Sequence, residues 1–246
     1  MFQILRKADQ IDGQFNGGAI LEKKPIGFPQ DKGKLKPYSN LFYWAYAWSN
    51  EGSTIGLHPH KGFEIMTFVL EGEIYHYDTQ INKWKNIKKG DVQIIRAGNG
   101  ISHAERMEAG SQMFQIWFDP DLSKSMSKPA SYDDYAREKF PHTNENGDLY
   151  IHYVGNGSPV EMDSDVMIQE VFLSSGMKDI RYINNYSVSI FIIEGSIEFE
   201  DQNFEKGDFF ISKEKNLNIT VLDNCRIFLI YTPVKVDYET YTEKYL

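Results

Sequence analysis

VLEGEIYHYDTQINKWKNIKKGDVQII, residues 69–95, has a shorter counterpart in IIEGSIEFEDQNFEKGDFFI, residues 192–211. Both stretches run from an apolar segment through Glu-Gly, an alternating segment, a polar turn and Lys-Gly-Asp into a further apolar segment. The second copy is shorter than the first between its Glu-Gly and its Gly-Asp, and a hairpin loop tolerates such a difference in length. An internal repeat at this long period predicts two homologous β domains rather than a solenoid.

The alternation of apolar and polar residues predicts an all-β protein, because side chains of a strand point to opposite faces in turn. Residues 119–148 are polar and proline-containing, and we expect them to be a linker with at most one short helix near Ser131–Lys139. Many short strands with Gly-rich turns and no alternating helices predict jelly-roll or barrel architecture rather than a doubly wound sheet. The expected strands are 63–70, 73–78, 91–96, 112–118, 166–173, 187–193, 196–200, 208–212 and 226–231.

Charge and composition exclude several classes of protein. The formal net charge is −9, which disfavours direct binding of nucleic acid, and the basic cluster at 83–89 falls where a hairpin should turn. The single cysteine, Cys225, cannot form an intramolecular disulfide or a cysteine zinc site. The N-terminus lacks the pattern of a secretory leader, and no apolar run approaches the length of a membrane span. We therefore expect a cytoplasmic protein with no membrane partner.

Two short motifs carry the metal-site prediction. In GLHPHKGFE, residues 56–64, an extended backbone would place His58 and His60 on one face, although this stretch alone does not exclude a polar turn. In AGNGISHAERM, residues 97–107, His103 and Glu105 repeat the same spacing. Two same-face pairs of ligand-type residues in a β-rich chain favour one metal site.

The chemistry of this ligand set indicates a transition metal. Imidazole and carboxylate without thiolate suit Fe(II), Mn(II), Ni(II), Cu(II) or Zn(II), and four protein ligands leave coordination positions open for substrate or dioxygen. Glu64 shares the parity of His58 and His60, so it is either a fifth ligand or, as we expect, an acceptor that orients a ligand histidine. Met66 and Phe68 follow at the same parity; such a stripe is usually ordinary core, but in a small barrel the core-facing residues also line the ligand pocket, and we expect these two to line an apolar substrate pocket.

Three further histidines receive no role from the sequence. His76 lies in an alternating segment and is expected to be a surface or packing residue, while His142 and His152 lie in or just after the expected linker.

The motifs resemble those of a known superfamily. GLHPHKGFEIMTFVLEG and KGDVQIIRAGNGISHAE are similar to the two cupin signatures, and HPHKGFE, AGNGISHAE and QIWFDP resemble the pirin family of bicupins over about residues 40–135. Arg96 stands where the general cupin pattern has Pro, Glu105 stands near its usual Asn, and Lys61 replaces an Arg of the pirin pattern. The Glu is itself a pirin trait, whereas Arg96 leaves the geometry of its loop open.

The resemblance implies a fold and a metal centre. It implies two tandem cupin jelly-roll β-barrels, namely a metal-binding N-terminal cupin at 1–125, and a linker with a degenerate C-terminal cupin at 126–246. The second repeat has no histidine, so no metal ligands are expected there. In pirins the metal ligands fall at the positions of His58, His60, His103 and Glu105. The resemblance favours Fe(II) as the cofactor, with Ni, Cu, Mn, Co and Zn as alternatives.

Two functions follow from the resemblance. The first is a quercetin 2,3-dioxygenase-like enzyme that oxidises a flavonol-like, phenolic or enediol substrate with O₂, in which Glu105, as the catalytic group, or a bound water accepts the substrate's hydroxyl proton. The second is a non-enzymatic, iron-binding redox sensor that acts as a transcriptional cofactor through a protein partner.

Overall fold

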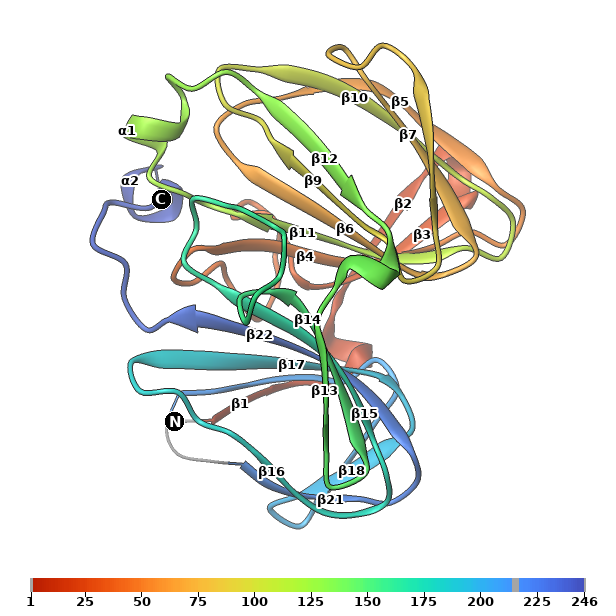
Figure 1. Cartoon of the computed structure of the whole chain (residues 1–246), viewed down its shortest axis with the longest axis vertical. Helices are drawn as coiled ribbons and strands as arrows, with labels where there is room; N and C mark the ends of the chain where they lie inside the picture. The colour runs from red at the N-terminus through yellow and green to blue at the C-terminus, as the bar shows by residue number, and fades with distance from the viewer. Residues whose placement is uncertain (1, 214–216, 246) are drawn as a thin grey trace. The chain divides into compact units, whose positions relative to one another are not determined.

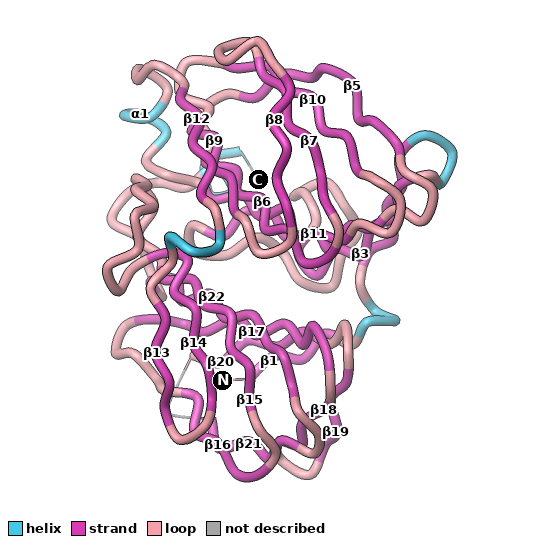
Figure 2. The backbone as a smooth tube through the Cα atoms, turned by 45° about the vertical axis from the view of Figure 1, so that its right-hand side comes forward, coloured by secondary structure: helices cyan, strands magenta, loops and turns pink. Residues whose placement is uncertain are grey.

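The computed structural model describes residues 2–213 and 217–245 and consists almost entirely of β-strands. The chain divides into two compact units, each built from a seven-stranded and a four-stranded antiparallel sheet. Figure 2 shows that helix is confined to a few short segments. The longest helix in the described ranges, α2 (Tyr241–Tyr245), has five residues, so none of them could cross a bilayer.

The first unit comprises residues 10–138, 162–164 and the segment from Val236 onward. Its larger sheet has the order β12-β9-β6-β11-β4-β3-β2, and its smaller sheet has the order β5-β10-β7-β8, whose strands run side by side in Figure 2. The strands are β2 (Ile11–Phe15), β3 (Ile20–Ile26), β4 (Leu41–Trp48), β5 (Ser53–His60), β6 (Glu64–Glu71), β7 (Glu73–Asp78), β8 (Trp84–Lys88), β9 (Val92–Arg96), β10 (Ile101–Met107), β11 (Gln112–Phe118) and β12 (Ser131–Tyr135).

The second unit comprises residues 2–9, 139–161 and 165–235, as far as they are described. Its sheets have the orders β1-β20-β17-β22-β15-β14-β13 and β16-β21-β18-β19. The strands are β1 (Phe2–Leu5), β13 (His142–Glu145), β14 (Asp148–Val154), β15 (Met167–Leu173), β16 (Gly176–Ile180), β17 (Tyr186–Glu194), β18 (Ser196–Phe199), β19 (Gln202–Glu205), β20 (Phe209–Ser212), β21 (Leu217–Val221) and β22 (Cys225–Pro233).

The two units repeat one topology, as the sequence repeat predicts. Every strand of the first unit has a counterpart at the same place in the sheet order of the second, with β6 matching β17 and β11 matching β22. The edge position of β12 is taken in the second unit by β1, the first strand of the chain (Figure 1). Each strand expected from alternation is present, with shifts of at most two residues at its ends.

The region expected to be a linker has more structure than its composition indicates. The short helix expected near Ser131–Lys139 is a strand, β12, followed by one 3-10 turn at Arg137–Lys139. β12 pairs with β9, so ladder hydrogen bonds along one edge outweigh the weak strand propensity of Asp133 and Asp134. The α-helix in this region, α1, spans only Leu122–Ser125.

The repeated Glu-Gly and Lys-Gly-Asp sequences make the same turns in both units. Gly72 and Gly195 have φ of +69° and +80°, and a Cβ at either position would come within 3.0 Å or less of backbone atoms of Ser111 or Asn224. Asp91 and Asp208 each accept a hydrogen bond from the backbone N–H three residues earlier, at 3.0 and 3.2 Å. These residues therefore specify the hairpin geometry that both barrels share.

The interiors of the two barrels differ in polarity. In the second unit one continuous apolar cluster fills the space between the sheets, with Phe204, Phe210 and Ile227 at or near zero exposure. In the first unit the apolar residues form separate smaller clusters, while Thr67, Gln93 and Glu105 are buried polar residues. The polar interior of the first unit contains the candidate site.

The turn geometry generates a prediction. Gly72→Ala should destabilise the protein by about 2–4 kcal/mol, because it combines a left-handed backbone with displacement of the Ser111 backbone. Gly110→Ala is the matched control: its φ is +78°, no described atom lies within 4 Å of the added Cβ, and only about 1–2 kcal/mol is expected. Urea unfolding of both variants measures the difference, and equal losses would contradict the close-approach argument.

Candidate metal centre

Three histidines from two neighbouring strands converge in the first unit. His58 and His60 lie on β5, and His103 lies on β10, where it pairs directly with His58. Their nearest ring nitrogens lie within 4.8 Å of one another, and the Nε2 atoms of His60 and His103 are 2.9 Å apart. The structure thus brings together three of the four ligands expected from the sequence.

The backbone of β5 explains how the His-x-His spacing presents both rings. β5 is the outermost strand of its sheet, so Pro59, which has no N–H, does not interrupt a central ladder. Side chains two apart on a strand share a face, which directs His58 and His60 to the same side. A register shift between β10 and β5 follows His103, so the ladder is regular through His60, Pro59 and His58 and irregular beyond.

The electrostatics of His60 and His103 favour neutral imidazoles. Burial, together with the neighbouring histidines, lowers the pKa of His103 to about 2, and burial and His58 lower the pKa of His60 to about 4. The Nδ1–H of His58 donates to the carbonyl oxygen of Gly56 at 2.8 Å, which fixes the ring by that nitrogen. Two neutral rings with their Nε2 atoms 2.9 Å apart, and a third imidazole with a ring nitrogen within 4.8 Å, are a donor set that a first-row divalent transition metal binds, so these residues fit the metal implied by the sequence.

Glu105 lies in the wall of the same cavity, outside the three-histidine cluster. Its carboxylate is 1 % exposed and accepts hydrogen bonds from the side-chain amides of Gln115, at 2.8 Å, and Gln93, at 3.4 Å. Burial, with a smaller contribution from the nearby Glu22, raises the pKa of Glu105 to about 7. Glu105 can therefore hold or release a proton near neutral pH.

Glu64, expected beside a ligand histidine, lies elsewhere in the unit. Its buried carboxylate accepts the backbone N–H groups of Asp163 at 2.6 Å and Ser164 at 2.9 Å. The polypeptide leaves one sheet at His60 and enters the other at Glu64, so the parity of β5 does not continue into β6.

The same break in parity explains why Met66 and Phe68 do not line the cavity. Both are fully buried on β6, on the opposite face from Thr67, and neither lines the cavity beside the histidines. Thr67 is the β6 residue that faces the polar interior, where its hydroxyl accepts a hydrogen bond from Gln93 at 2.9 Å.

The cavity beside the histidines has a volume of about 350 Å³ and mainly apolar walls. Trp117 stands edge-on to His60 with ring centroids 4.7 Å apart, and its Nε1–H donates to Gln115 at 3.2 Å. Glu22 on β3 accepts a hydrogen bond from the hydroxyl of Tyr43 on β4 at 3.3 Å. The wall includes Ile20, Glu22, Phe28, Tyr43, Ile55, Met113, Gln115 and Trp117.

The motifs of the sequence do not reveal these wall residues, although one signal is present. Gln115 interrupts the apolar run of the strand expected at 112–118, and a polar residue inside such a run can mark a strand that faces a functional cavity; Trp117 shares its parity. Glu22 and Tyr43 lie in strands that the alternation did not reveal, so they had no such signal.

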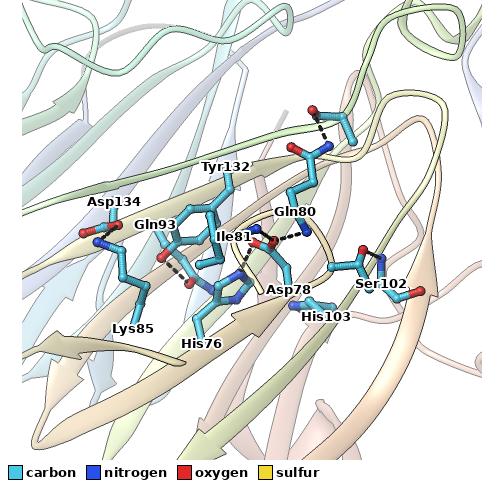
Figure 3. Close-up of polar contacts among 12 residues, drawn as sticks. His76, Asp78, Gln80, Ile81, Lys85, Gln93, Ser102, His103, Tyr132 and Asp134 are labelled. Atoms are coloured by element: carbon cyan, nitrogen blue, oxygen red, sulfur yellow. Dashed lines mark hydrogen bonds and ion pairs between the residues drawn. The ribbon is translucent and has the colours of Figure 1, made fainter. Parts of the chain in front are cut away.

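His76, expected to be a surface or packing residue, is completely buried next to the cluster. Its ring stacks on Tyr132 with centroids 4.3 Å apart, and its Nε2 lies 2.8 Å from the carboxylate of Asp78. Figure 3 shows this pair with His103 alongside.

Comparison with known proteins places the chain in a family. The family model described as Pirin matches residues 34–118. The Pseudomonas aeruginosa protein PA1210, which carries the provisional name quercetin 2,3-dioxygenase, is 30% identical over 190 residues, or 73% of this chain and 77% of that protein. The chain belongs to the pirin family. This agrees with the resemblance of the two histidine motifs.

Solved structures show that this pirin has the two-domain cupin fold. The bacterial pirin YhhW of Escherichia coli, solved in complex with nickel(II), has a TM-score of 0.79 at 19% identity and covers 96% of this chain and 100% of its own. A quercetin 2,3-dioxygenase of Acinetobacter baumannii has a TM-score of 0.80 at 18% identity and covers 94% and 79%. The expected tandem cupin architecture is confirmed.

The histidine cluster predicts how this pirin binds metal. His103→Ala should strongly reduce the metal retained after reconstitution with Ni(II), because it removes the buried donor of the cluster. His152→Ala is the control: His152 is a buried histidine of the second unit, bonded to Gln169 and Thr143. Metal analysis of gel-filtered protein measures the loss, and unchanged metal content in His103→Ala would overturn the assignment.

The raised pKa of Glu105 predicts how the stability of metal-free protein depends on pH. The unfolded chain ionises this carboxyl near the ordinary value of 4.5, whereas the folded protein does so near 7. The folded state therefore binds more protons between these values, and stability falls as the pH rises through that window. Glu105→Gln removes this effect and should be more stable than wild type by on the order of 1–3 kcal/mol at pH 8.

Urea unfolding of chelator-treated protein at pH 4 and pH 8 measures this effect. The advantage of Glu105→Gln should disappear at pH 4, where the carboxyl is protonated in both states. The exposed Glu51 provides a control, since Glu51→Gln should not change the pH dependence. An advantage that is the same at both pH values would contradict the burial argument.

Proposed function

We propose that the N-terminal cupin is a metal-dependent dioxygenase acting on a flavonol-like substrate, of the quercetin type or a related phenol or enediol. The observation that carries the proposal is the cluster of neutral histidines opening onto an aromatic-walled cavity that also contains the carboxyl of Glu105. The names of PA1210 and the Acinetobacter baumannii protein support the same reaction class.

The proposed ligands are His58, His60, His103 and Glu105, holding one divalent metal, with Fe(II) the first choice and Ni, Cu, Mn, Co or Zn as alternatives. Nickel in the structure of YhhW supports a divalent metal in this fold. When bound, such a metal acts as a Lewis acid toward a chelating hydroxy-ketone and brings it together with O₂. The C-terminal barrel is proposed to be a cupin without metal ligands, and the protein to be cytoplasmic.

The residues of the chain have separable roles in this proposal. Phe28, Tyr43 and Trp117 provide a wall that binds aromatic rings and excludes water. Glu105, whose buried carboxylate lies in the wall of this cavity, accepts the hydroxyl proton of the substrate on a carboxylate oxygen. The amide of Gln115 holds that carboxylate in place, and Trp117 in turn donates to Gln115.

Glu22 is proposed to contact a second part of the substrate. Its side chain is buried in a mainly apolar wall, and its Oε1 accepts a hydrogen bond from the hydroxyl of Tyr43 at 3.3 Å. A carboxylate so placed has acceptor capacity left for a hydroxyl group of a bound phenol.

The proposal predicts O₂ uptake with quercetin by metal-reconstituted protein. His60→Ala should abolish the uptake, because it removes an Nε2 donor 2.9 Å from that of His103. An oxygen electrode measures the rate under matched loading. Lys206→Ala, an exposed change in the other unit, should retain wild-type uptake.

The same experiment tests the alternative function. Stoichiometric metal binding without O₂ consumption across flavonols, catechols and enediols would overturn the enzyme proposal. That outcome would favour an iron-binding, redox-sensing regulator that acts through a protein partner.

A further inference from the structure

Two completely buried histidines each have one ring nitrogen without a hydrogen-bond partner among the described residues. These atoms are Nδ1 of His76 and Nδ1 of His103. Leaving a buried polar atom without a partner costs about 1–3 kcal/mol, so two such atoms in adjacent side chains call for an explanation. His58 provides the contrast, because its Nδ1–H donates to the backbone carbonyl of Gly56.

The surroundings of His76 determine which of its nitrogens carries the proton. His76 has no acceptor beside its Nδ1 among the described residues, so a proton on that nitrogen would be left without a partner. Its Nε2 lies 2.8 Å from Oδ2 of Asp78, and a carboxylate can only accept, so the proton is on Nε2. The Nδ1 atom of His76 is therefore a lone pair that can accept a hydrogen bond.

Asp78 is itself fixed on two sides. Its other oxygen, Oδ1, accepts the backbone N–H groups of Gln80 at 2.7 Å and Ile81 at 2.8 Å, as Figure 3 shows. Tyr132 stacks on the ring of His76 at an interplanar angle of 6°. The acceptor nitrogen of His76 is thus carried by a ring that cannot easily turn.

The position of His103 requires a hydrogen-bond acceptor near its Nδ1. Its Nε2 faces Nε2 of His60 at 2.9 Å, within the histidine cluster. If Nε2 of His103 is to donate its lone pair there, the single proton of this neutral ring must be on Nδ1, where it needs an acceptor. His103 lies opposite Asp78 in the β10–β7 ladder, and the ring centroids of His103 and His76 are 5.6 Å apart.

We propose that His76 and Asp78 form a positioning pair for His103, in which Nδ1 of His76 accepts the Nδ1–H of His103. At the observed ring separation, a small change in ring tilt or one bridging water completes this hydrogen bond. The pair then holds His103 in the tautomer whose Nε2 lone pair points toward His58 and His60. A partner of this kind orients a metal-binding histidine and makes it a better donor.

A purely structural role accounts for only part of this arrangement. Capping the turn at Gln80 and Ile81 requires only Oδ1 of Asp78, and stacking on Tyr132 requires only a flat ring. Neither explains why the ring is a histidine with one nitrogen bonded to a carboxylate and the other unpartnered beside His103. The positioning role uses both nitrogens.

The first test reads the tautomers directly in the metal-free, full-length protein. Nitrogen-15 NMR of labelled histidines should show His76 protonated on Nε2 and His103 protonated on Nδ1. A His103 ring that carries its proton on Nε2 would overturn the proposal. This measurement requires no variant beyond those used for assignment.

The second test measures the affinity for Co(II) by chelator competition. Asp78→Asn should weaken binding roughly 10- to 100-fold, because an amide that donates to Nε2 of His76 moves the ring proton to Nδ1 and removes the acceptor. Asp91→Asn is the matched control: Asp91 also caps a turn in this unit, accepting from the N–H groups of Lys88 and Arg137, and contacts no histidine. Its Co(II) affinity should remain that of wild type.

Variants of His76 separate positioning from packing. His76→Leu removes the acceptor and should weaken Co(II) binding, whereas His76→Gln can offer its amide oxygen to His103 and should restore part of the affinity. Wild-type affinity in both Asp78→Asn and His76→Leu would overturn the positioning pair. The inference rests on the proposed metal centre and not on its substrate: absence of O₂ uptake with normal Co(II) binding would refute only the dioxygenase.

Discussion

The close approach of the histidine ring nitrogens, with His103 fully buried, is the constraint on which the first barrel depends. Nitrogens 2.9 Å apart, as in His60 and His103, are stable only if a proton or a cation lies between them. The remaining N–H of each ring then needs a hydrogen-bond acceptor. Each acceptor must in turn be kept in position by its own hydrogen bonds. The interior of the barrel is polar for that reason, and its amides and carboxylates occupy space that would otherwise contain apolar core.

The second barrel shows what the same topology becomes without this constraint. Its strands follow the same order and its turns use the same Glu-Gly and Lys-Gly-Asp sequences, yet a single apolar cluster fills its interior. Turn residues and strand alternation therefore determine the architecture, and the inward-facing residues determine whether a barrel has a site. This separation explains how one chain can contain a polar and an apolar version of the same fold.

Much of the fold and part of the site could be predicted from the sequence. Short, mainly apolar segments with partial alternation predict β6, β11 and β17, and the repeated turns predict two barrels, because these patterns report local geometry. The i, i+2 spacing brings His58 and His60 to one face for the same reason. Parity fails where the chain passes from one sheet to the other, and this break places Glu64, Met66 and Phe68 away from the histidines.

Other parts of the site depend on contacts between distant strands. His76 is opposite Glu105 and Asp78 is opposite His103 only through the register of β7 against β10, which no local pattern specifies. Glu22 reaches the cavity from β3, a strand whose alternation is too weak to recognise. Residues that are brought together by strand pairing can be identified only when the register of the two strands is known.

The edge strand β1 has a consequence for how the protein is made. β1 pairs with β20, and Phe2 packs against Phe199, Phe204 and Phe210 of the second barrel. During synthesis β1 leaves the ribosome about two hundred residues before β20, a wait on the order of ten seconds or more at ~5–20 residues per second. During that interval β1 has not yet met its partner strand β20. The first barrel must therefore fold without forming a ladder with β1. A C-terminal fragment that begins after the first barrel would lack β1 and expose the edge of β20. The second cupin is therefore not encoded by one continuous stretch of the sequence.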